Sequence, residues 1–486
     1  MKEAAFLLGL LLAVARADGQ TQRMIVVEPL ADSETELGCT LREAVDVASA
    51  GLMEGLGCVF EQSGSGFPIH YTLAVPAYEY AVSSLVIQGH LTVVGRGIGE
   101  TIIRGTSALK GTFDVISLAG RLVLENLTIT GSGEAVRNRG DVTIRNVDVQ
   151  ANSSGGIVNH GSVRISDSIV RDNQSDYGGG IYSAGSLTVE NSVLAGNRAT
   201  RSGGGIYSLG TMAIVDSSIV SNSTQFSRAL EGGGGIYLAG KSTLSRVAVA
   251  DNRSTLFGGG ILAVQGGDLL LRQSSVSRNV ANNRGGGLYI DSMVVDIANS
   301  TIARNVTGDA GGAIAVGPGS EVYLSHVTVY ENEASETGGV ANLGSRFSVV
   351  QVYSSIVADN QSGDCLLIES NGYNVLGDPK GCAAAFPAGQ PNANGDYVGF
   401  ESAVVLELGN LRYANPRYHP ARTSVVVNKI PTQDCVYRLS QISERSIRNG
   451  EPVTADQRGR ERDNVCDIGA VESAGVFRSS FERVVD

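Results

Sequence analysis

An all-β fold, a single-stranded right-handed parallel β-helix with a cap at each end, is the architecture that this sequence predicts. Two markers recur along its middle: a Gly-Gly-aliphatic motif, and an asparagine that returns every 21 to 30 residues. The third observation is that aliphatic residues hold fixed positions relative to each asparagine. A repeat of this length indicates stacked units, each of which buries its apolar face against its neighbours.

The asparagine marks successive coils: Asn152, Asn173, Asn197, Asn222, Asn252, Asn279, Asn305, Asn332 and Asn360. Eight residues before each of them, and again three residues before, the residue is Ile, Val or Leu. In segments such as 187–190, apolar and polar residues alternate, which is the period of a strand with one buried face. Such strands should stack in parallel at about 4.8 Å per coil, in the right-handed sense that strand twist and crossover chirality favour.

Both markers have a structural explanation. The glycine pairs supply positive φ or let neighbouring coils approach closely. Each asparagine is expected to tolerate the left-handed conformation in its turn, and stacked amides can satisfy one another where the turn is buried. We therefore interpret the repeated Gly and Asn residues as structural.

The two ends of the repeat call for caps, because an open stack of strands exposes its edges. All six cysteines lie outside the centre of the chain, and pairing of sequence neighbours is the simplest of the 15 possible arrangements. It predicts the disulfides Cys39–Cys58, Cys365–Cys382 and Cys435–Cys466. The chain then divides into a signal peptide (1–17), an N-terminal cap with the first coils (18–120), the β-helix repeats (121–360), a C-terminal cap (361–472) and a tail (473–486).

Composition agrees with this organisation. Glycine supplies 63 of 486 residues, nearly twice the ordinary share of ~7%, whereas proline supplies only 11. The formal net charge is 37 − 49 = −12, which argues against a nucleic-acid partner, because phosphates need a basic face.

The N-terminus reads as a secretory signal. Lys2 precedes an apolar stretch at 4–14 and an Ala-Arg-Ala end, which predicts cleavage after Ala17. No later stretch reaches the ~18 apolar residues of a membrane helix, so we expect a protein that is secreted or held at the cell surface. The cysteines would then lie in an oxidising compartment, and none has the C-x-x-C spacing of a zinc site.

Three segments carry a family resemblance. Residues 38–45, Gly-Cys-Thr-Leu-Arg-Glu-Ala-Val, resemble the signature of the CSLREA domain, with Thr40 in place of Ser. Residues 311–314 (Gly-Gly-Ala-Ile) and 170–173 (Val-Arg-Asp-Asn) are similar to the G-G-A-I and F-x-x-N elements of polymorphic outer-membrane-protein repeats. Residues 466–472 resemble the closing motif of choice-of-anchor Q proteins. The resemblance implies a secreted or surface-exposed bacterial β-helix protein without one agreed reaction.

Catalytic motifs are absent from the sequence. A glycosidase needs two carboxyls within about 5.5 to 9.5 Å; in the outward columns of the strands the acids Glu190 and Asp296 lie about 19 Å apart at ~4.8 Å per coil. His70, His90, His326 and His419 look isolated. We therefore expect no catalytic residue, no metal and no cofactor.

One outward column is a candidate ligand site. The residue after the inward Ile or Leu of the glycine motif should face outward, and it is tyrosine at Tyr182, Tyr207, Tyr237 and Tyr289. Such a column can stabilise the sheet, lie beneath a loop, contact a protein or stack on sugar rings.

Adhesion or binding of a polysaccharide or host-surface glycan, without catalysis, is the function that these features favour. The alternatives are a polysaccharide lyase or glycoside hydrolase of the pectate-lyase type, and a purely structural surface component. The acidic net charge favours neutral or cationic glycans over polyuronates.

Overall fold

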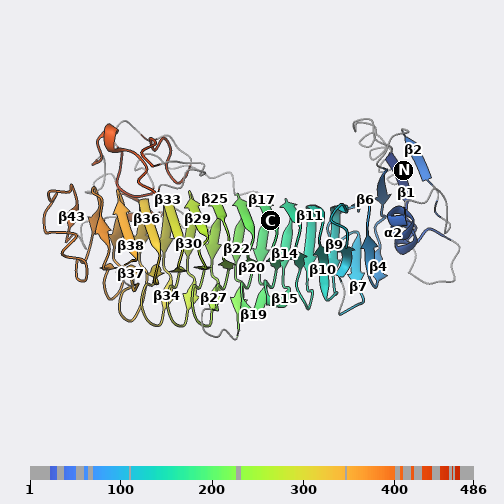
Figure 1. Ribbon diagram of the computed structural model, residues 1–486, viewed down its shortest axis with the longest axis horizontal. Coiled ribbons are helices and arrows are strands. Elements are labelled where there is room, and N and C mark those ends of the chain that lie inside the picture. The colour runs from blue at the N-terminus through green and yellow to red at the C-terminus, as the bar shows by residue number, and fades with distance from the viewer. Residues whose placement is uncertain are drawn as a thin grey trace. The chain divides into compact units, whose positions relative to one another are not determined.

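The computed structural model describes residues 22–29, 38–50, 58, 60–63, 69–108, 111–225, 231–344, 347–399, 406–408, 418–420, 429–440, 449–458, 462 and 466–470. The predicted signal peptide and tail lie outside these residues. The chain forms two compact units, residues 1–199 with 209–211, and residues 200–208 with 212–486. Each unit is a stack of coils with the parallel pairing that the repeat predicts (Figure 1).

One coil consists of four short strands, which we call a, b, c and d in chain order. In the coil that begins with the glycine motif at 178–180 they are β16 (Ile181–Ser183), β17 (Ser186–Glu190), β18 (Val193–Ala195) and β19 (Arg198–Ser202). Five a-strands belong to the first unit and seven to the second, so the two units hold about twelve coils of a right-handed parallel β-helix.

In the first unit, the a-strands before β16 are β5 (Leu85–Ile87), β8 (Gly111–Val115), β10 (Glu134–Asn138) and β12 (Ile157–Asn159). The b-strands before β17 are β3 (His70–Ala74), β6 (His90–Val94) and β13 (Ser162–Ser166), and β9 (Arg121–Thr130) and β11 (Asp141–Gln150) combine b and c. The remaining c- and d-strands are β4 (Glu79–Val82), β7 (Ile102–Gly105), β14 (Ile169–Arg171) and β15 (Gln174–Tyr177).

In the second unit, the a-strands are β20 (Ile206–Ser208), β24 (Ile236–Leu238), β28 (Ile261–Val264), β32 (Leu288–Asp291), β35 (Ile314–Val316), β37 (Val340–Asn342) and β40 (Cys365–Leu366). The b-strands are β21 (Thr211–Val215), β25 (Ser242–Ser245), β29 (Asp268–Arg272), β38 (Val349–Tyr353) and β41 (Glu369–Ser370), and β33 (Val294–Ala303) and β36 (Glu321–Tyr330) combine b and c. The c-strands are β22 (Ser218–Val220), β26 (Ala248–Ala250), β30 (Ser275–Ser277), β39 (Ile356–Ala358), β42 (Val375–Leu376) and β43 (Tyr397–Val398). The d-strands are β23 (Ser223–Thr224), β27 (Arg253–Ser254), β31 (Val280–Ala281) and β34 (Val306–Thr307). A short antiparallel pair, β44 (Leu406–Leu408) and β45 (Tyr418–Pro420), and the 3-10 helix η1 (Thr432–Asp434) follow.

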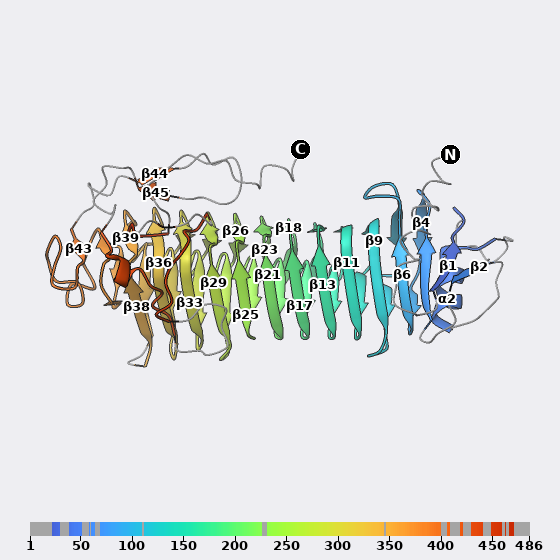
Figure 2. The ribbon, with the colours of Figure 1, turned by 90° about the horizontal axis from the view of Figure 1, so that it is seen from above.

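The interior of the coils is the aliphatic core that the sequence columns predict. Ile144, Ile165 and Val189 in the first unit are fully buried, and so are the equivalent residues of the second unit. Register pairs them in order: Ile144 opposes Ile165, and Ile165 opposes Val189. Figure 2 shows the b-strands of successive coils lying side by side.

The asparagines form hydrogen-bonded ladders, as predicted. In the second unit each side-chain amide from Asn222 to Asn332 lies in contact with the next, for example Asn252 Nδ2 to Asn279 Oδ1 at 3.0 Å. The backbone N–H of Asn252 donates to the same oxygen at 3.0 Å. Asp364 ends this ladder by accepting from Asn360 at 2.7 Å, since a carboxylate accepts without needing to donate.

The left-handed turn residue differs from the prediction. Positive φ falls on the residue before the ladder asparagine, such as Asp251 (57°) and Arg278 (53°), and not on the asparagine itself. The glycine expectation holds, because Gly258 has a φ of 60° and a Cβ there would lie 2.3 Å from the carbonyl oxygen of Ile261. The ladder asparagine therefore acts through its amide, and its neighbour makes the turn.

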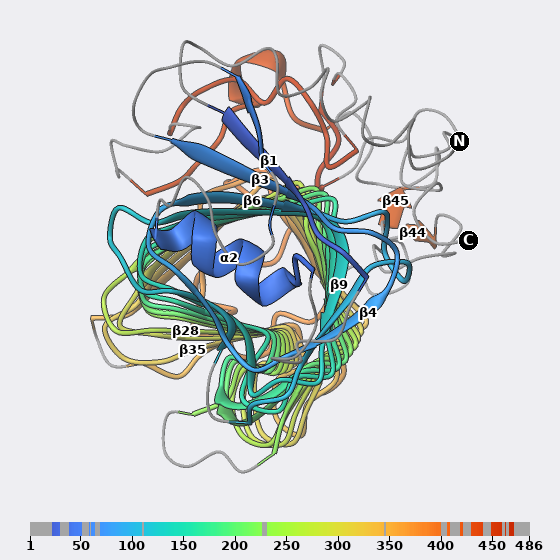
Figure 3. The same cartoon turned by 90° about the vertical axis from the view of Figure 1, so that its right-hand side faces the viewer.

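The N-terminal cap is built around the helix α2 (Leu41–Ala50). Thr40 and Glu43 form a capping box: the Thr40 N–H donates to Glu43 Oε2 at 2.9 Å, and the Glu43 N–H donates to Thr40 Oγ1 at 3.3 Å. The apolar face of α2 packs on β3, β5 and β6, across the end of the first unit (Figure 3). Beside it β1 (Gln22–Val26) pairs in parallel with β3 and antiparallel with β2 (Phe60–Ser63).

All three predicted disulfides are present: Cys39–Cys58, Cys365–Cys382 and Cys435–Cys466. The last of these joins parts of a segment that we call the strap, residues 429–440, 449–458, 462 and 466–470. Among the described residues, no helix is long and apolar enough to span a membrane.

The strap covers the outer face of the b- and c-strands in the second unit. The backbone N–H of Ser440 donates to the fully buried Asp296 at 2.9 Å, and Gln457 Nε2 donates to the carbonyl of Ser274 at 2.8 Å. Ile468 packs in a buried cluster with Ile356 and other residues of both segments. This face of the second unit is consequently closed to solvent over several coils.

Removal of one ladder asparagine should destabilise the second unit strongly. In Asn279→Leu, the backbone N–H of Asn252 loses its acceptor in a buried site, and the Asn252 side-chain amide loses one of its two acceptors and keeps the carbonyl of Ile219. We expect the free energy of unfolding to fall by roughly 3 kcal/mol or more, at ~1–3 kcal/mol for each unsatisfied group. Urea unfolding would measure this loss. The control Asn282→Leu changes an exposed asparagine three residues away and should stay within about 0.5 kcal/mol of wild type; equal losses in both variants would contradict the ladder.

His326 should make the strap sensitive to acid. The imidazole is fully buried, lies 6.3 Å from the ring of Tyr437 in the strap, and has its pKa lowered well below the ordinary value by burial and by Arg462. The pKa of His326 is lower in the folded state than in the unfolded state. The contribution of the neutral His326 imidazole to stability is therefore present above about pH 6.5 and is lost as the pH falls. His326→Asn should therefore show a smaller loss of stability between about pH 6.5 and 4.5, measured by urea unfolding at each pH.

Asparagine is a suitable replacement at this position because Asn299, at the equivalent turn one coil earlier, has the same left-handed conformation as His326. The exposed residue His160 supplies the control, and His160→Asn should keep the wild-type pH dependence. An unchanged slope in His326→Asn would rule out His326 as its source.

Candidate functional site

A shallow trough lies on the outer face of the b-strands in the first unit. Its floor is formed by Val123 and Thr143, short side chains that lie opposite each other in one outward column, which continues through Thr92 to the buried Thr72. Arg164 follows Thr143 in the same column. A long side chain after a row of short ones closes the trough at that end.

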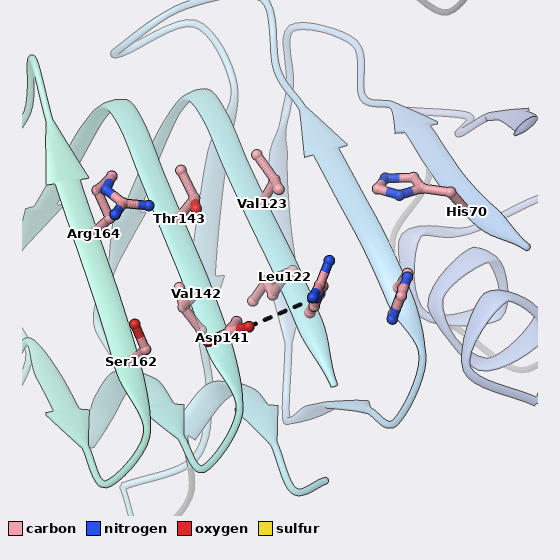
Figure 4. A pocket seen from close by; sticks show the side chains of 10 residues that line it. His70, Leu122, Val123, Asp141, Val142, Thr143, Ser162 and Arg164 are labelled. Atoms are coloured by element: carbon pink, nitrogen blue, oxygen red, sulfur yellow. Dashed lines mark ion pairs between the residues drawn. The ribbon is translucent and has the colours of Figure 1, made fainter. Parts of the chain in front are cut away.

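One wall of the trough is the neighbouring outward column, which lies two residues earlier on each strand. It consists of His70, His90, Arg121, Asp141 and Ser162, each opposite the next in register. The hollow between wall and floor has a volume of about 340 Å³ and extends from the histidines to Arg164 (Figure 4).

The histidine end of the trough is held by close contacts. His70 Nε2 lies 2.8 Å from Thr92 Oγ1, and the rings of His70 and His90 meet edge to face at 6.3 Å. Burial, with smaller contributions from His90 and Arg121, lowers the pKa of the His70 imidazole from its ordinary value. His70 is therefore neutral at pH 7 and can both donate and accept a hydrogen bond.

The arginine end has free hydrogen-bonding capacity. Arg121 and Asp141 approach only to 3.6 Å, and both side chains are more than half exposed (64% and 58%). Arg164 forms no ion pair or hydrogen bond with any part of the chain that the structure describes. A ligand can therefore reach guanidinium donors without breaking an internal ion pair at Arg164.

The lining suits binding of a polar, ring-shaped ligand. Hydroxyls of Thr143 and Ser162, the imidazoles and the guanidiniums offer hydrogen bonds, whereas Val123 offers a small apolar surface. Asp141 is the one carboxylate in this lining, whereas glycoside hydrolysis uses two. The residues described contain no cluster of three or more His, Cys, Asp or Glu side chains that could hold a metal ion.

Sequence reasoning missed this site because it treated His70 and His90 as isolated, which was wrong. The two histidines occupy one register position on adjacent strands. A signal for this was available: residues 70–73 and 90–93 share the pattern His-x-Thr-aliphatic, one coil apart. The glycine and asparagine markers are missing from these first coils, so the repeat was aligned only from Asn152 onward.

The predicted tyrosine column is largely covered. Tyr207 and Tyr237 stack with ring centroids at 4.3 Å and an angle of 12°, the arrangement expected for a column of outward rings. Tyr237 and Tyr289 keep only 4% and 5% of their surface exposed, because they pack in an outer cluster with Leu262 and Phe257. Phe257 comes from the turn that precedes the glycine motif, and its ring lies 4.7 Å from that of Tyr289.

Tyr182 belongs to the first unit and is partly exposed, with His160 at 5.7 Å. Tyr207 is also partly exposed. A ligand-binding role for Tyr182, Tyr207, Tyr237 and Tyr289 stays a prediction, and the covered rings of Tyr237 and Tyr289 have little surface left for a sugar.

Comparison with known proteins adds little. No protein-family model matches the chain, and no curated protein matches its sequence. Among solved structures, the A-module of the mannuronan C-5 epimerase AlgE4 from Azotobacter vinelandii is similar, with a TM-score of 0.36 and 17% identity over 68% of this chain and 89% of that chain. A likeness of this extent assigns neither a substrate nor a reaction to this protein.

The burial of the tyrosines predicts unequal effects on stability. Tyr237→Ser removes a buried ring from the outer cluster and should lower the free energy of unfolding by roughly 3 kcal/mol. Tyr182→Ser removes a partly exposed ring and should cost about 1 kcal/mol or less. Urea unfolding of the two variants checks this difference; equal, small losses would show that Tyr237 is not packed as described.

Proposed function

We propose that this protein is a secreted, non-catalytic glycan-binding β-helix protein, and that it binds a polysaccharide in the trough of its first unit. The observation that carries the proposal is the combination of a short-side-chain floor with a wall of hydrogen-bonding groups, aligned along the stacking direction. Four strand intervals, from His70 to Ser162, span about 19 Å at ~4.8 Å each. A short run of sugar units can lie along such a trough.

Sugar recognition needs the two kinds of contact that this trough supplies. Hydroxyl, imidazole and guanidinium groups can bond to sugar hydroxyls, and aliphatic surface can pack on the C–H face of a ring. Affinity for one short segment would be modest and would gain from repetition along a polymer.

The three disulfides support a location outside the cytoplasm, since such bonds persist in oxidising compartments. The resemblance of residues 38–45 and 466–472 to CSLREA and choice-of-anchor Q proteins supports a bacterial secreted or surface protein. Both points remain part of the proposal, together with the predicted cleavage after Ala17.

Filling the trough should abolish glycan retention. Thr143→Phe places a ring on the floor, and we expect the variant to lose binding to every glycan that wild type retains on an array. Thr188→Phe is the matched control, because Thr188 lies in the same outward column, beyond Arg164, and is similarly half-buried. That variant should bind like wild type.

Retention by Thr143→Phe, or equal loss in both variants, would overturn the trough as the binding site. New reducing ends or unsaturated sugars in the bound polymer would overturn the non-catalytic part of the proposal and favour a lyase or hydrolase.

A further inference from the structure

We infer that the saccharide bound in the trough is acidic, and that its carboxylate or sulfate group pairs with Arg164 at the closed end. This inference rests on the glycan binding proposed above. It names a class of ligand that the composition of the chain argues against.

Several exterior arginines of the first unit have internal partners: Arg145 pairs with Glu125, Arg137 with Glu134 at 2.7 Å, and Arg171 with Asp148 at 2.9 Å. Among the described residues of this unit, the exposed Arg139, Arg164 and Arg198 have none. Of these three, Arg164 is the one that lines the trough. In a chain with a net charge of −12, an arginine that faces a hollow without a carboxylate of its own is suited to an anion from outside.

Arg121 is a second cation within reach of the same ligand. Its contact with Asp141 is long, at 3.6 Å, and lies in solvent, where such a pair contributes little. Arg121 can therefore turn toward a bound anion without a large loss. Arg121 and Arg164 lie two strands apart, about 10 Å at ~4.8 Å per strand, which is roughly the length of a disaccharide.

For a ligand bound in the trough, the charges of the lining residues matter more than the net charge of the whole chain. The lining contains two arginines and one aspartate, which gives 2 − 1 = +1 before the histidines are counted. Charges farther away than ~8 Å are largely screened at physiological ionic strength. The acidic surface elsewhere slows the approach of a polyanion, but the groups that touch the ligand decide which glycan remains bound.

The floor residues Val123 and Thr143 are neutral. Two acids lie in the column on the other side, outside the lining: Glu125, which is paired with Arg145, and the exposed Glu190, which lies one strand beyond Arg164. An acidic group over the floor consequently meets cations at two places and a single carboxylate at the wall.

The test compares four polymers: polygalacturonate (a carboxylate on every sugar), hyaluronan (a carboxylate on alternate sugars), dextran sulfate, and dextran as the neutral control. We expect wild type to bind at least one acidic polymer and to bind dextran about tenfold more weakly or not at all. Binding of polygalacturonate or hyaluronan would indicate a carboxylate ligand, whereas binding of dextran sulfate alone would indicate a sulfate ligand. Affinity should fall as salt is raised.

Two variants locate the contact. Arg164→Gln should weaken binding of the acidic polymer about tenfold or more, since it removes a charged hydrogen-bond donor. Arg198→Gln changes the net charge equally but removes an exposed arginine that does not line the trough. It should change the affinity by less than about threefold.

The outcomes separate the two proposals. If dextran binds as well as the acidic polymers, and Thr143→Phe abolishes that binding, glycan binding stands and the acidic ligand is overturned. If Arg198→Gln weakens binding as much as Arg164→Gln, the net charge of the protein determines the affinity and the contact at Arg164 is overturned. If wild type retains none of the glycans tested, both proposals fall.

Discussion

Parallel stacking of equivalent residues is the constraint on which the rest of this structure depends. Each coil hydrogen-bonds to the coils before and after it, so every side chain lies above its counterpart one coil away. Inside, this favours columns of like aliphatic residues; in the turn beside the c-strand, it favours an amide that can donate and accept along the stack. The ladder asparagines meet that need, and Asp364 can end the ladder because the last position needs only an acceptor.

The same constraint converts single side chains into surface features of several coils. A trough forms where Val123 and Thr143 put short side chains next to each other in one column, and it ends where Arg164 occupies the next position. No loop has to be folded into a pocket. The core does not restrict the outward columns. A binding site can therefore form in an outward column wherever a few residues depart from the usual pattern of that column.

Periodicity predicted the coils, the inward columns, the amide ladders and the disulfide pairs, because each depends on residues that repeat or that are few. Contacts between segments far apart in the chain could not be predicted in this way. Nothing in the repeat indicates that Ser440 covers Asp296, or that Phe257 from a turn covers Tyr289. His70 and His90 were missed for another reason: their coils lack the markers that set the alignment.

The two units use the same outer face of the b-strands in different ways, and their sequences differ accordingly. In the second unit this face carries Leu270 and Ala298, which are buried beside the strap residues that bond to Asp296 and Ser274. In the first unit the column of Leu270 carries Thr143 and Arg164, and the column of Ala298 carries Glu125 and Arg145. These side chains suit water or a polar ligand and would be costly to bury without partners. The open face of the first unit is thus a property of its outward columns. Other exposed arginines of this unit, Arg139 and Arg198, also have no internal partner among the described residues, but Arg164 is the one of the three whose guanidinium faces the trough, where an anionic group of a ligand can reach it.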